Sequence, residues 1–410
     1  MKFILFTGTI ARVGGAQMYV KNKINYMRSL GWEVYVFSAL DGPILINGLS
    51  DFKETIIPEL YQYPGLVRKN KIIKMIMDTI GYAEESSEEI LIESNAIPIS
   101  CWAEIIAEKL KAKHFMFLLD EHLEYSEEYY EFVKFKFDRK EIAVIKEKLV
   151  KKLLRDRVDV NDPERYILRA VCTNVVEDTK DERFDGIDYS KFDYTFCSLG
   201  RLNKEYIPSV IEGFEKFALK HPEKNLCCIF IGDQPENFVP DMKKVITERL
   251  GKISNISLRM IGYVYPVPLS FFQNIDIGVA TSGSASLFWK QDVVTISMDV
   301  YDNYPIGVLG YTTKNTMIRE KEQKYDLDVL IEKILFQNYL KNHHYSAPNN
   351  NSTEFWFNQH FTFIEQSESQ KEYYDVSGIK IMSVRDKMKR FLFGMFGVRN
   401  CQKIKFLINK

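Results

Sequence analysis

The sequence predicts an α/β protein that is built from two doubly wound parallel sheets. Short apolar runs alternate with segments of helical periodicity, and this alternation occurs in both halves of the chain. At 410 residues the chain is long enough for two or three domains of about 150 residues each. Several of the apolar runs are followed by small or polar residues. Such residues would lie at the carboxyl edge of a parallel sheet, where ligands bind. We therefore expect two Rossmann-like halves with a cleft between them.

The composition indicates a globular protein that does not bind nucleic acid. A hydrophobic content of 46% and a charged content of 27% are typical of soluble domains. The formal net charge of −1 gives no reason to expect a nucleic acid as partner. No stretch reaches the roughly 18–20 apolar residues that span a bilayer, and the first residues read as a strand rather than as a signal peptide.

Cysteine and histidine usage predicts neither disulfides nor a metal site. The six cysteines include no CxxC pair, and most lie in apolar runs, where buried reduced thiols are typical of a cytosolic protein. The six histidines form no HxxH or HExxH pattern. We therefore expect a cytoplasmic protein that requires no metal and no other cofactor.

The N-terminal residues predict a β-strand, a loop, a helix and a second strand. The apolar run 3–6 is typical of a buried strand, 17–30 has helical spacing, and 33–38 is the second strand. The connecting loop contains Gly14 and Gly15 but lacks the GxGxxG fingerprint, which disfavours a nicotinamide cofactor. Adjacent glycines before a helix suit a loop that faces a cleft, and an ordinary flexible turn is the alternative.

Polar residues follow a further strand of this half. The run 114–119 is followed directly by Asp120, Glu121 and His122. Side chains just past the carboxyl end of a parallel strand lie where ligands bind. These three residues are candidate sugar or acceptor contacts, and a carboxylate or imidazole there is a candidate general base. Chance placement is the alternative for each of them.

Two segments are rich in lysine and arginine and are interleaved with apolar residues. The first is 131–157, where the apolar spacing is helical; the second is 379–410, which has nine Lys and Arg and one acidic residue, Asp386. Both are candidates for contact with an anionic membrane surface. For 131–157 the favoured alternative is an amphipathic helix packed on the sheet, and for 379–410 it is a packed or disordered tail.

The second half repeats the alternation after a polar linker at 181–193. Its strands are predicted at 194–199, 226–231 and 256–261, with helices at 207–219 and 240–250. We divide the chain into an N-terminal domain (1–185), a C-terminal domain (186–365) and a crossing helix with a basic tail (366–410).

A loop of small residues follows the predicted strand 276–280. It runs from Thr281 through Ser282, Gly283, Ser284 and Ala285 to Ser286 and leads into a helix. Small side chains let a diphosphate approach the backbone N–H groups at the start of a helix. An ordinary turn is the alternative for this loop taken alone.

Three stretches resemble the GT-B glycosyltransferases, and among them the family 4 (glycosyltransferase group 1) nucleotide-sugar enzymes. They read GGAQMYVKNKINYMRSLGWEVYVFS, SLGRLNKEYIPSVIEGFEKFALKHPEKNLCCIFIGD and LRMIGYVYPVPLSFFQNIDIGVATS. Their order and spacing extend over nearly the whole chain. The resemblance implies two Rossmann-like domains facing a cleft, a nucleotide-diphosphate sugar as donor, and a donor site in the C-terminal domain.

The resemblance also implies roles for individual residues. Arg201 matches the arginine that contacts the donor diphosphate, and Lys204 is close enough to replace the lysine expected where this chain has Tyr206. A cation there offsets the charge that develops on the leaving diphosphate. Gly14 and Gly15 would approach the phosphate. The backbone that would hold the nucleobase is Gly262, Tyr263 and Val264, and the donor-site loop is Ser282, Gly283, Ser284, Ala285 and Ser286.

The chain departs from this family in one respect. Retaining members carry two glutamates seven residues apart in the donor segment, whereas this chain has no glutamate between Glu248 and Glu320. Hydroxyls and loop N–H groups are the remaining contacts, and Asp299, Asp302 and Asn303 lie just downstream. The sequence therefore leaves retention or inversion open.

The function that this resemblance implies is transfer of a sugar from a nucleotide donor to a glycan or lipid-linked acceptor, in cell-surface polysaccharide synthesis. Such an acceptor would place the protein in the cytoplasm and at the inner face of the membrane as a peripheral protein. Two alternatives stay open: a non-catalytic GT-B module that partners another glycosyltransferase, and a nucleotide-sugar epimerase, which the missing glutamates disfavour.

Overall fold

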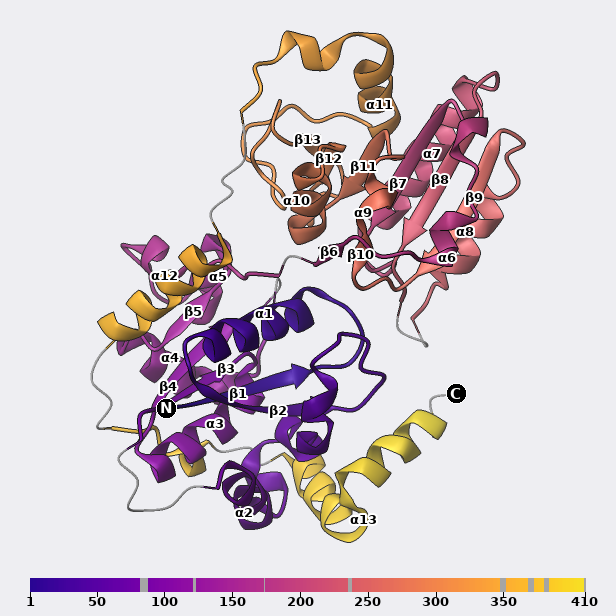
Figure 1. Cartoon of the computed structure of the whole chain (residues 1–410). Coiled ribbons are helices and arrows are strands. Elements are labelled where there is room, and N and C mark those ends of the chain that lie inside the picture. The colour runs from indigo at the N-terminus through magenta and orange to yellow at the C-terminus, as the bar shows by residue number, and fades with distance from the viewer. Residues whose placement is uncertain are drawn as a thin grey trace. The chain divides into compact units, whose positions relative to one another are not determined.

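The computed structural model describes residues 1–81, 88–120, 123–172, 174–234, 238–346, 352–367, 372–379 and 383–408 (Figure 1). By their contacts the residues form two compact units. The first comprises Met1–Arg12, Tyr19–Val171 and Ser352–Lys410, and the second comprises Val13–Met18 and Cys172–Asn351. Each unit contains a largely parallel sheet covered by helices, as the alternating sequence pattern predicts.

The first unit contains a five-stranded parallel sheet in the order β2-β1-β3-β4-β5. Its strands are β1 (Lys2–Thr9), β2 (Glu33–Leu40), β3 (Ile90–Ser94), β4 (Lys113–Leu118) and β5 (Ile142–Val144). Its helices include α1 (Gly15–Ser29), α2 (Lys69–Ile80), α3 (Ile97–Leu110), α4 (Tyr130–Asp138), α5 (Glu147–Leu153), α12 (Thr353–Gln366) and α13 (Val384–Ile408). Most strand residues are buried, which explains why the strands read as continuous apolar runs.

The second unit contains a six-stranded sheet in the order β13-β12-β11-β7-β8-β9, in which β13 alone is antiparallel. Its strands are β7 (Tyr194–Leu199), β8 (Leu226–Ile231), β9 (Ile256–Gly262), β11 (Ile277–Ala280), β12 (Val294–Met298) and β13 (Pro305–Val308). Its helices include α6 (Glu182–Asp185), α7 (Ile207–Lys220), α8 (Met242–Leu250), α9 (Leu269–Phe272), α10 (Ser282–Lys290) and α11 (Leu327–Phe336). A separate two-stranded ladder joins β6 (Val176–Glu177) to β10 (Val267–Pro268).

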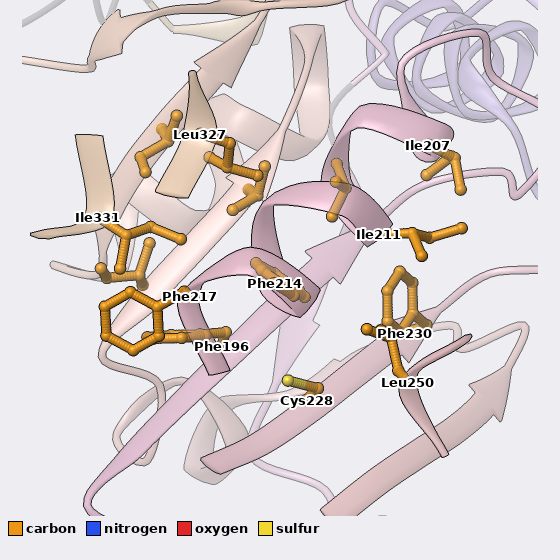
Figure 2. Packing of buried hydrophobic residues seen from close by; sticks show 14 of the residues in the cluster. Phe196, Ile207, Ile211, Phe214, Phe217, Cys228, Phe230, Leu250, Leu327 and Ile331 are labelled. Atoms are coloured by element: carbon orange, nitrogen blue, oxygen red, sulfur yellow. The ribbon is translucent and has the colours of Figure 1, made fainter. Parts of the chain in front are cut away.

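Helix α7 organises the core of the second unit (Figure 2). The ring of Phe214 lies 5.4 Å from the ring of Phe196 on β7 and 5.9 Å from that of Phe230 on β8. On the same helix, a Cβ added to Gly213 would lie 2.6 Å from the Cβ of Leu327. The missing side chain therefore lets α11 pack closely on α7, which holds the first strands of the sheet in place.

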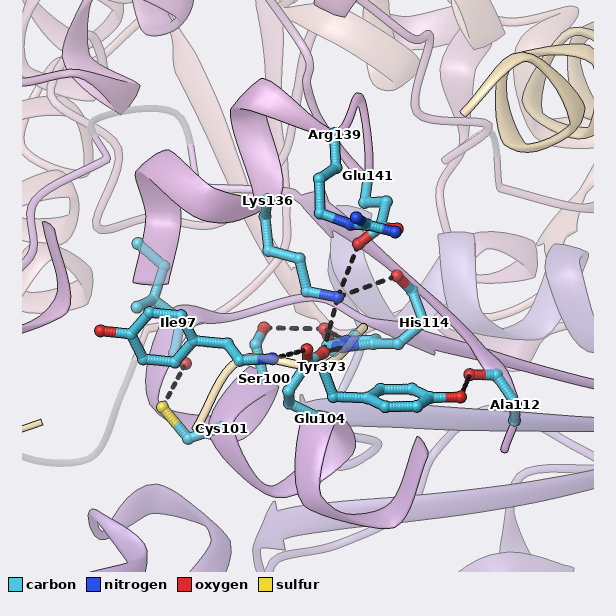
Figure 3. A network of polar contacts seen from close by, with 12 residues as sticks. Ile97, Ser100, Cys101, Glu104, Ala112, His114, Lys136, Arg139, Glu141 and Tyr373 are labelled. Carbon is cyan, nitrogen blue, oxygen red and sulfur yellow. Dashed lines mark hydrogen bonds and ion pairs between the residues drawn. The ribbon is translucent and has the colours of Figure 1, made fainter. Parts of the chain in front are cut away.

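The first unit buries a network of charged side chains (Figure 3). Lys136 on α4 lies 2.6 Å from Glu104 on α3 and 3.0 Å from Glu141, and all three side chains are fully or almost fully buried. His114 on β4 lies 2.6 Å from Glu104. Burial and the Lys136 ammonium lower the pKa of His114 to about 4. Burial alone would raise the pKa of Glu104, but the cation and the imidazole outweigh it and lower that pKa to about 2.

Helix α12 packs on the first unit through aromatic side chains. The Lys23 ammonium of α1 lies 5.0 Å from the ring centre of Phe357 and 5.5 Å from that of Phe361, and 3.4 Å from Glu93 on β3. His360 is buried and hydrogen-bonded through Nε2 to the Arg169 carbonyl oxygen. A buried ion pair faced by aromatic rings thus fixes this C-terminal helix on the N-terminal sheet.

The helical expectation for 131–157 is wrong for its middle part. The segment forms α4, strand β5 and α5, and Ile142 of β5 pairs with Met116 of β4. The apolar residues of the two helices continue at similar spacing across a strand of three residues, which hides it from a periodicity count. None of the large apolar side chains of this segment is exposed, so they pack on the sheet, as in the favoured alternative.

Within the described ranges, none of the helices combines the length and the apolar character that crossing a bilayer requires.

Candidate functional site

Three adjacent strands of the second unit end in glycine, and these ends meet. Gly200, Gly232 and Gly262 follow or close β7, β8 and β9, which are neighbours in the sheet. The N–H of Gly232 donates to the carbonyl oxygen of Gly262 at 2.8 Å. A Cβ added to Gly232 would lie 1.9 Å from the carbonyl oxygen of Gly200, and its φ of 137° is one that side chains rarely adopt. At these three strand ends the backbone segments therefore pack closely, and the glycines carry no side chains.

The strand order of this sheet reverses between β7 and β11. From β7 the chain proceeds outward to β8 and β9, and then returns to place β11 on the other side of β7. Ligands of open α/β sheets bind in the crevice outside the carboxyl ends of the strands at such a reversal. Two of the sequence-predicted elements flank it: Arg201 follows β7, and the loop at Ser282 follows β11.

Arg201 is placed to meet a ligand. Its side chain is exposed, and no hydrogen bond or ion pair of its guanidinium is found in the described part of the chain. Lys204 lies half-buried three residues on. Tyr206, where the sequence resemblance implies a lysine, is 1% exposed and belongs to the core. The cations that follow β7 are therefore Arg201 and Lys204.

The loop after β11 starts helix α10 in a strained conformation. Ser282 has a φ of 56°, in the left-handed region that a residue with a side chain rarely adopts. Its N–H and the hydroxyl of Thr281 both donate to the carbonyl oxygen of Thr316, at 2.6 and 2.9 Å. These bonds hold the turn so that α10 begins at the strand end, where its first N–H groups favour an anion.

The side chains of this loop differ in their exposure. Ser282, Gly283, Ser284 and Ser286 are half-buried, whereas Ala285 is fully buried in the apolar cluster under the sheet. The Ser286 hydroxyl donates to the carbonyl oxygen of Ser282 at 3.3 Å. Ala285 can therefore meet a ligand only through its backbone.

The Gly14–Gly15 loop and the start of α10 come together at Cys172. A Cβ added to Gly15 would lie 3.7 Å from the Cβ of Cys172, and one added to Gly283 would lie 3.0 Å from its carbonyl oxygen. All of these residues belong to the second unit by their contacts. Two elements predicted independently from the sequence are thus neighbours, and Cys172, which no motif indicated, is the residue between them.

An arginine that the sequence did not indicate holds the Gly262 turn. Nη1 of Arg183 donates to the carbonyl oxygens of Ile261 and Tyr263, at 3.3 and 2.8 Å. The carboxylate of Asp181 fixes the guanidinium, and this hydrogen bond lowers the pKa of Asp181. Both residues lie in the stretch predicted as a linker, where a polar composition gives no indication of a contact eighty positions away. Val264 is buried and Tyr263 is half-buried.

The residues proposed on the acceptor side lie in the first unit. Asp120 is exposed just after β4. Burial raises the pKa of Tyr61, and the charge of Asp120 raises it further. The Asp120 carboxylate therefore lies near the Tyr61 side chain. Glu121 and His122 lie outside the described residues. Their assignment and that of Asp120 stay predictions.

The acidic residues downstream of β12 have a structural use. Asp299 is buried and accepts hydrogen bonds from the backbone N–H groups of Tyr301 at 2.7 Å and of Arg319 at 2.6 Å. Asp302 forms an ion pair with Arg319 at 2.8 Å, and Asn303 has a φ of 65°. These contacts build the turn before β13, and they occupy the two carboxylates that lie downstream of the donor-site loop.

The described residues include no group of three or more His, Cys, Asp or Glu that could hold a metal ion.

The contact between the glycines predicts the effect of a single methyl group. Gly232→Ala should lower the free energy of unfolding by about 3 kcal/mol, because the backbone around Gly200 must move and the residue takes a strained φ. Nucleotide binding should weaken with it. Gly186→Ala is the matched control in the same unit, since its nearest neighbour would be 3.8 Å away. Urea unfolding checks both, and equal midpoints for the two variants would contradict the packing described here.

No protein-family model matches the chain, and a search of curated proteins gives no match either. Solved structures do match it. A glycosyltransferase from Rickettsia africae is 12% identical, with 99% of this chain and 97% of that chain covered and a TM-score of 0.52. HepE from Anabaena, solved with UDP and glucose, is 11% identical, with 96% and 99% covered and a TM-score of 0.52.

A third similar structure is the α,α-trehalose 6-phosphate synthase from Burkholderia multivorans. It is 11% identical, with 89% of this chain and 98% of that chain covered and a TM-score of 0.53. At these identities the matches show the fold. The predicted fold class, α/β with two Rossmann-like domains of the GT-B type, is confirmed.

Proposed function

We propose that the chain is a glycosyltransferase that moves a sugar from a nucleotide-diphosphate donor to a glycan or lipid-linked acceptor. The observation that carries this proposal is the strand reversal at the carboxyl edge of the second unit's sheet. Bare glycine backbone, an uncommitted arginine and the start of a helix converge there on one sheet edge. This is the combination that a diphosphate requires. The GT-B fold, shared with a protein solved with UDP and glucose, supports it.

In the proposed mechanism the chain stabilises the leaving nucleoside diphosphate. As the bond between the sugar and the diphosphate breaks, negative charge grows on the phosphate oxygens. Arg201 offsets that charge with a planar fork of donors, and Lys204 adds a second cation. The N–H groups of Gly283 and Ser284 in the first turn of α10 and those of the Gly14–Gly15 loop supply the remaining hydrogen bonds. Gly262, Tyr263 and Val264 hold the nucleobase through the turn that Arg183 fixes. This arrangement needs no metal ion.

The acceptor hydroxyl needs a group that takes its proton. We assign that role to Asp120, with Glu121 and His122 beside it in sequence. An exposed carboxylate just past a strand end is a suitable general base because its oxygens can accept a proton from an acceptor hydroxyl. The acceptor is proposed to belong to surface polysaccharide synthesis, with the protein acting in the cytoplasm at the inner face of the membrane.

A second candidate is a non-catalytic GT-B module that binds a nucleotide sugar beside another transferase. Two observations favour it. Tyr206 is committed to the core in place of the family's lysine, and the loop from Ser282 to Ser286 offers hydroxyls where the family has glutamates. Such a module would keep the phosphate site and lack transfer.

Thermal unfolding in the presence of nucleoside diphosphates and their sugars tests the shared part of both proposals. A diphosphate at about a hundred times its Kd stabilises the native state by about 2.7 kcal/mol, which raises the Tm of a unit of this size by about 5–10 °C. A shift with one base and not with others identifies the donor. If no common diphosphate changes the Tm, both candidates are wrong. A shift without transfer across a panel of donors and acceptors supports the non-catalytic module.

A further inference from the structure

The C-terminal helix α13 exposes a row of large apolar side chains. Before its kink at Gly397, where φ is 74°, five of them share one face and are here called the apolar stripe: Val384, Met388, Phe391, Leu392 and Met395. Their side chains are 84%, 60%, 65%, 36% and 60% exposed. Phe396 is also exposed and lies about 40° beyond Leu392 around the helix. Isolated exposed apolar residues are common, but five on one helix face form a continuous patch.

The stripe points away from the protein because the opposite face of the helix is the one that docks. Successive helical residues are about 100° apart, so the stripe occupies an arc of about 100° and Phe393 lies about 150° from its middle. Phe393 packs against the core of the first unit. Arg68 donates to the carbonyl oxygen of Gly394 at 3.1 Å, and beyond the kink Val398 is 1% exposed. The helix is thus fixed on the body in an orientation that leaves the stripe in solvent.

Basic side chains border the stripe on both sides. By helical position Arg385 follows one edge, and Lys387 and Arg390 follow the other; all three are exposed. Within the described residues none of the three has an acidic partner. The one acidic residue of this helix, Asp386, is half-buried and is taken up by Lys389 at 3.3 Å and by Ser383 at 2.6 Å. The exposed side of the helix therefore carries positive charge alone.

The start of α2 extends this charge. Arg68 immediately precedes α2 and contacts α13, so the first turns of α2 lie beside α13 in the first unit (Figure 1). Lys69, Lys71 and Lys74 on these turns are exposed. Helices α2 and α13, which are far apart in the sequence, thus present cations next to one apolar stripe.

We propose that the apolar stripe and its basic borders bind the surface of an anionic lipid bilayer, with α13 lying in the plane of the headgroups. An apolar face flanked by cations matches a membrane, whose acyl chains accept the apolar side chains and whose phosphates pair with the cations. A second copy of the chain would bring like charges together on both sides of the stripe, which opposes association through this face. The inference holds whether or not the chain transfers a sugar.

The other basic segment of the sequence, 131–157, does not compete for this role. The apolar residues of 131–157 pack in the core, so that segment has no apolar face to insert. Both segments are basic, but only α13 exposes apolar side chains that could enter a membrane.

Sedimentation of the full-length chain with lipid vesicles tests the proposal. The protein should pellet with vesicles of equimolar phosphatidylcholine and phosphatidylglycerol, and stay in solution with phosphatidylcholine alone. Phe391→Ser with Met395→Ser should weaken binding at least about tenfold, because two apolar side chains no longer leave water. Lys387→Gln with Arg390→Gln should weaken it about 30-fold, from about 1 kcal/mol for each charge near the surface.

Matched controls lie on the second unit. Leu219 on α7 is as exposed as Phe391, at 65%, and Lys252 is exposed after α8. Leu219→Ser and Lys252→Gln should bind vesicles like the unchanged protein. Equal binding by the stripe variants and the controls would overturn the proposal, as would equal binding to neutral vesicles.

Two further measurements distinguish insertion from other occupants of the stripe. In a Phe391→Trp variant the emission of the new tryptophan should shift to the blue with anionic vesicles, and brominated lipids should quench it. Absence of both effects would contradict insertion. Sedimentation velocity in the absence of lipid should give the same species for the unchanged protein and the Phe391→Ser, Met395→Ser variant. A dimer that these substitutions dissociate would assign the stripe to a second copy and overturn the membrane proposal.

Discussion

Replacing Arg201 with alanine is expected to remove the stabilisation by nucleoside diphosphate and to slow sugar transfer by about two to three orders of magnitude. The guanidinium is exposed at the strand reversal of the second unit and is bound to no other described side chain, so its removal should leave the fold intact. We propose that the guanidinium stabilises the transition state, in which the diphosphate oxygens gain negative charge. Thermal unfolding with the diphosphate and single-turnover transfer measure the two effects.

The control for this prediction is an arginine on the same sheet. Arg259 is exposed in the middle of β9, where it pairs in register with Ile229 and lies away from the carboxyl edge. Arg259→Ala should leave the diphosphate shift and the transfer rate unchanged. Arg201→Lys should restore binding in part, because a lysine keeps the charge but loses the planar fork. A full diphosphate shift in Arg201→Ala would show that the ligand does not bind at this strand reversal.

The fold was predictable because its signals are local. A parallel strand covered on both faces reads as an apolar run, as at Phe3–Phe6 and Leu226–Ile231, and the helices between such runs keep their own period. Where the signals overlapped the prediction failed: β5 lies between two amphipathic helices and is only three residues long. Its place is set by pairing with β4, a contact that no local pattern encodes.

The candidate site was predictable to the extent that it is made of backbone. Gly14, Gly15, Gly262 and the loop at Ser282 stand out in a sequence because small residues are needed wherever a chain approaches another group closely. The contacts that position them are not visible in this way. Arg183 reaches the Gly262 turn, and Cys172 lies between two loops, only after the chain has folded.

The buried charges of the first unit show the same limit. Glu104 and Lys136 lie on predicted helices where charged residues normally face solvent, and His114 is the second residue of strand β4. No sequence pattern indicates that these residues pair, yet all three are fully buried and in contact. Their pairing joins α3, β4 and α4 and therefore depends on the tertiary arrangement.

Lys136→Met should destabilise the first unit by about 3–5 kcal/mol. The substitution keeps the volume and the apolar stem of the side chain, so the loss measures the charge. Without the ammonium, Glu104 and Glu141 stay buried with less compensation, and burial already raises the pKa of Glu141. The pKa of Glu104, which Lys136 holds down, should rise as well. Urea unfolding followed by circular dichroism gives the change in free energy.

Lys134 on the same helix is the matched control for this prediction. It forms an ion pair with Asp138 at the surface, where both side chains are largely exposed. Lys134→Met should therefore change the free energy of unfolding by less than about 1 kcal/mol. Adding Glu104→Gln to Lys136→Met should recover part of the loss, because Glu104 is the buried carboxylate that loses its lysine, whereas Glu141 keeps its ion pair with Arg139. If Lys136→Met and Lys134→Met unfold at the same urea concentration, the buried network does not hold α3, β4 and α4 together, and apolar packing alone must do so.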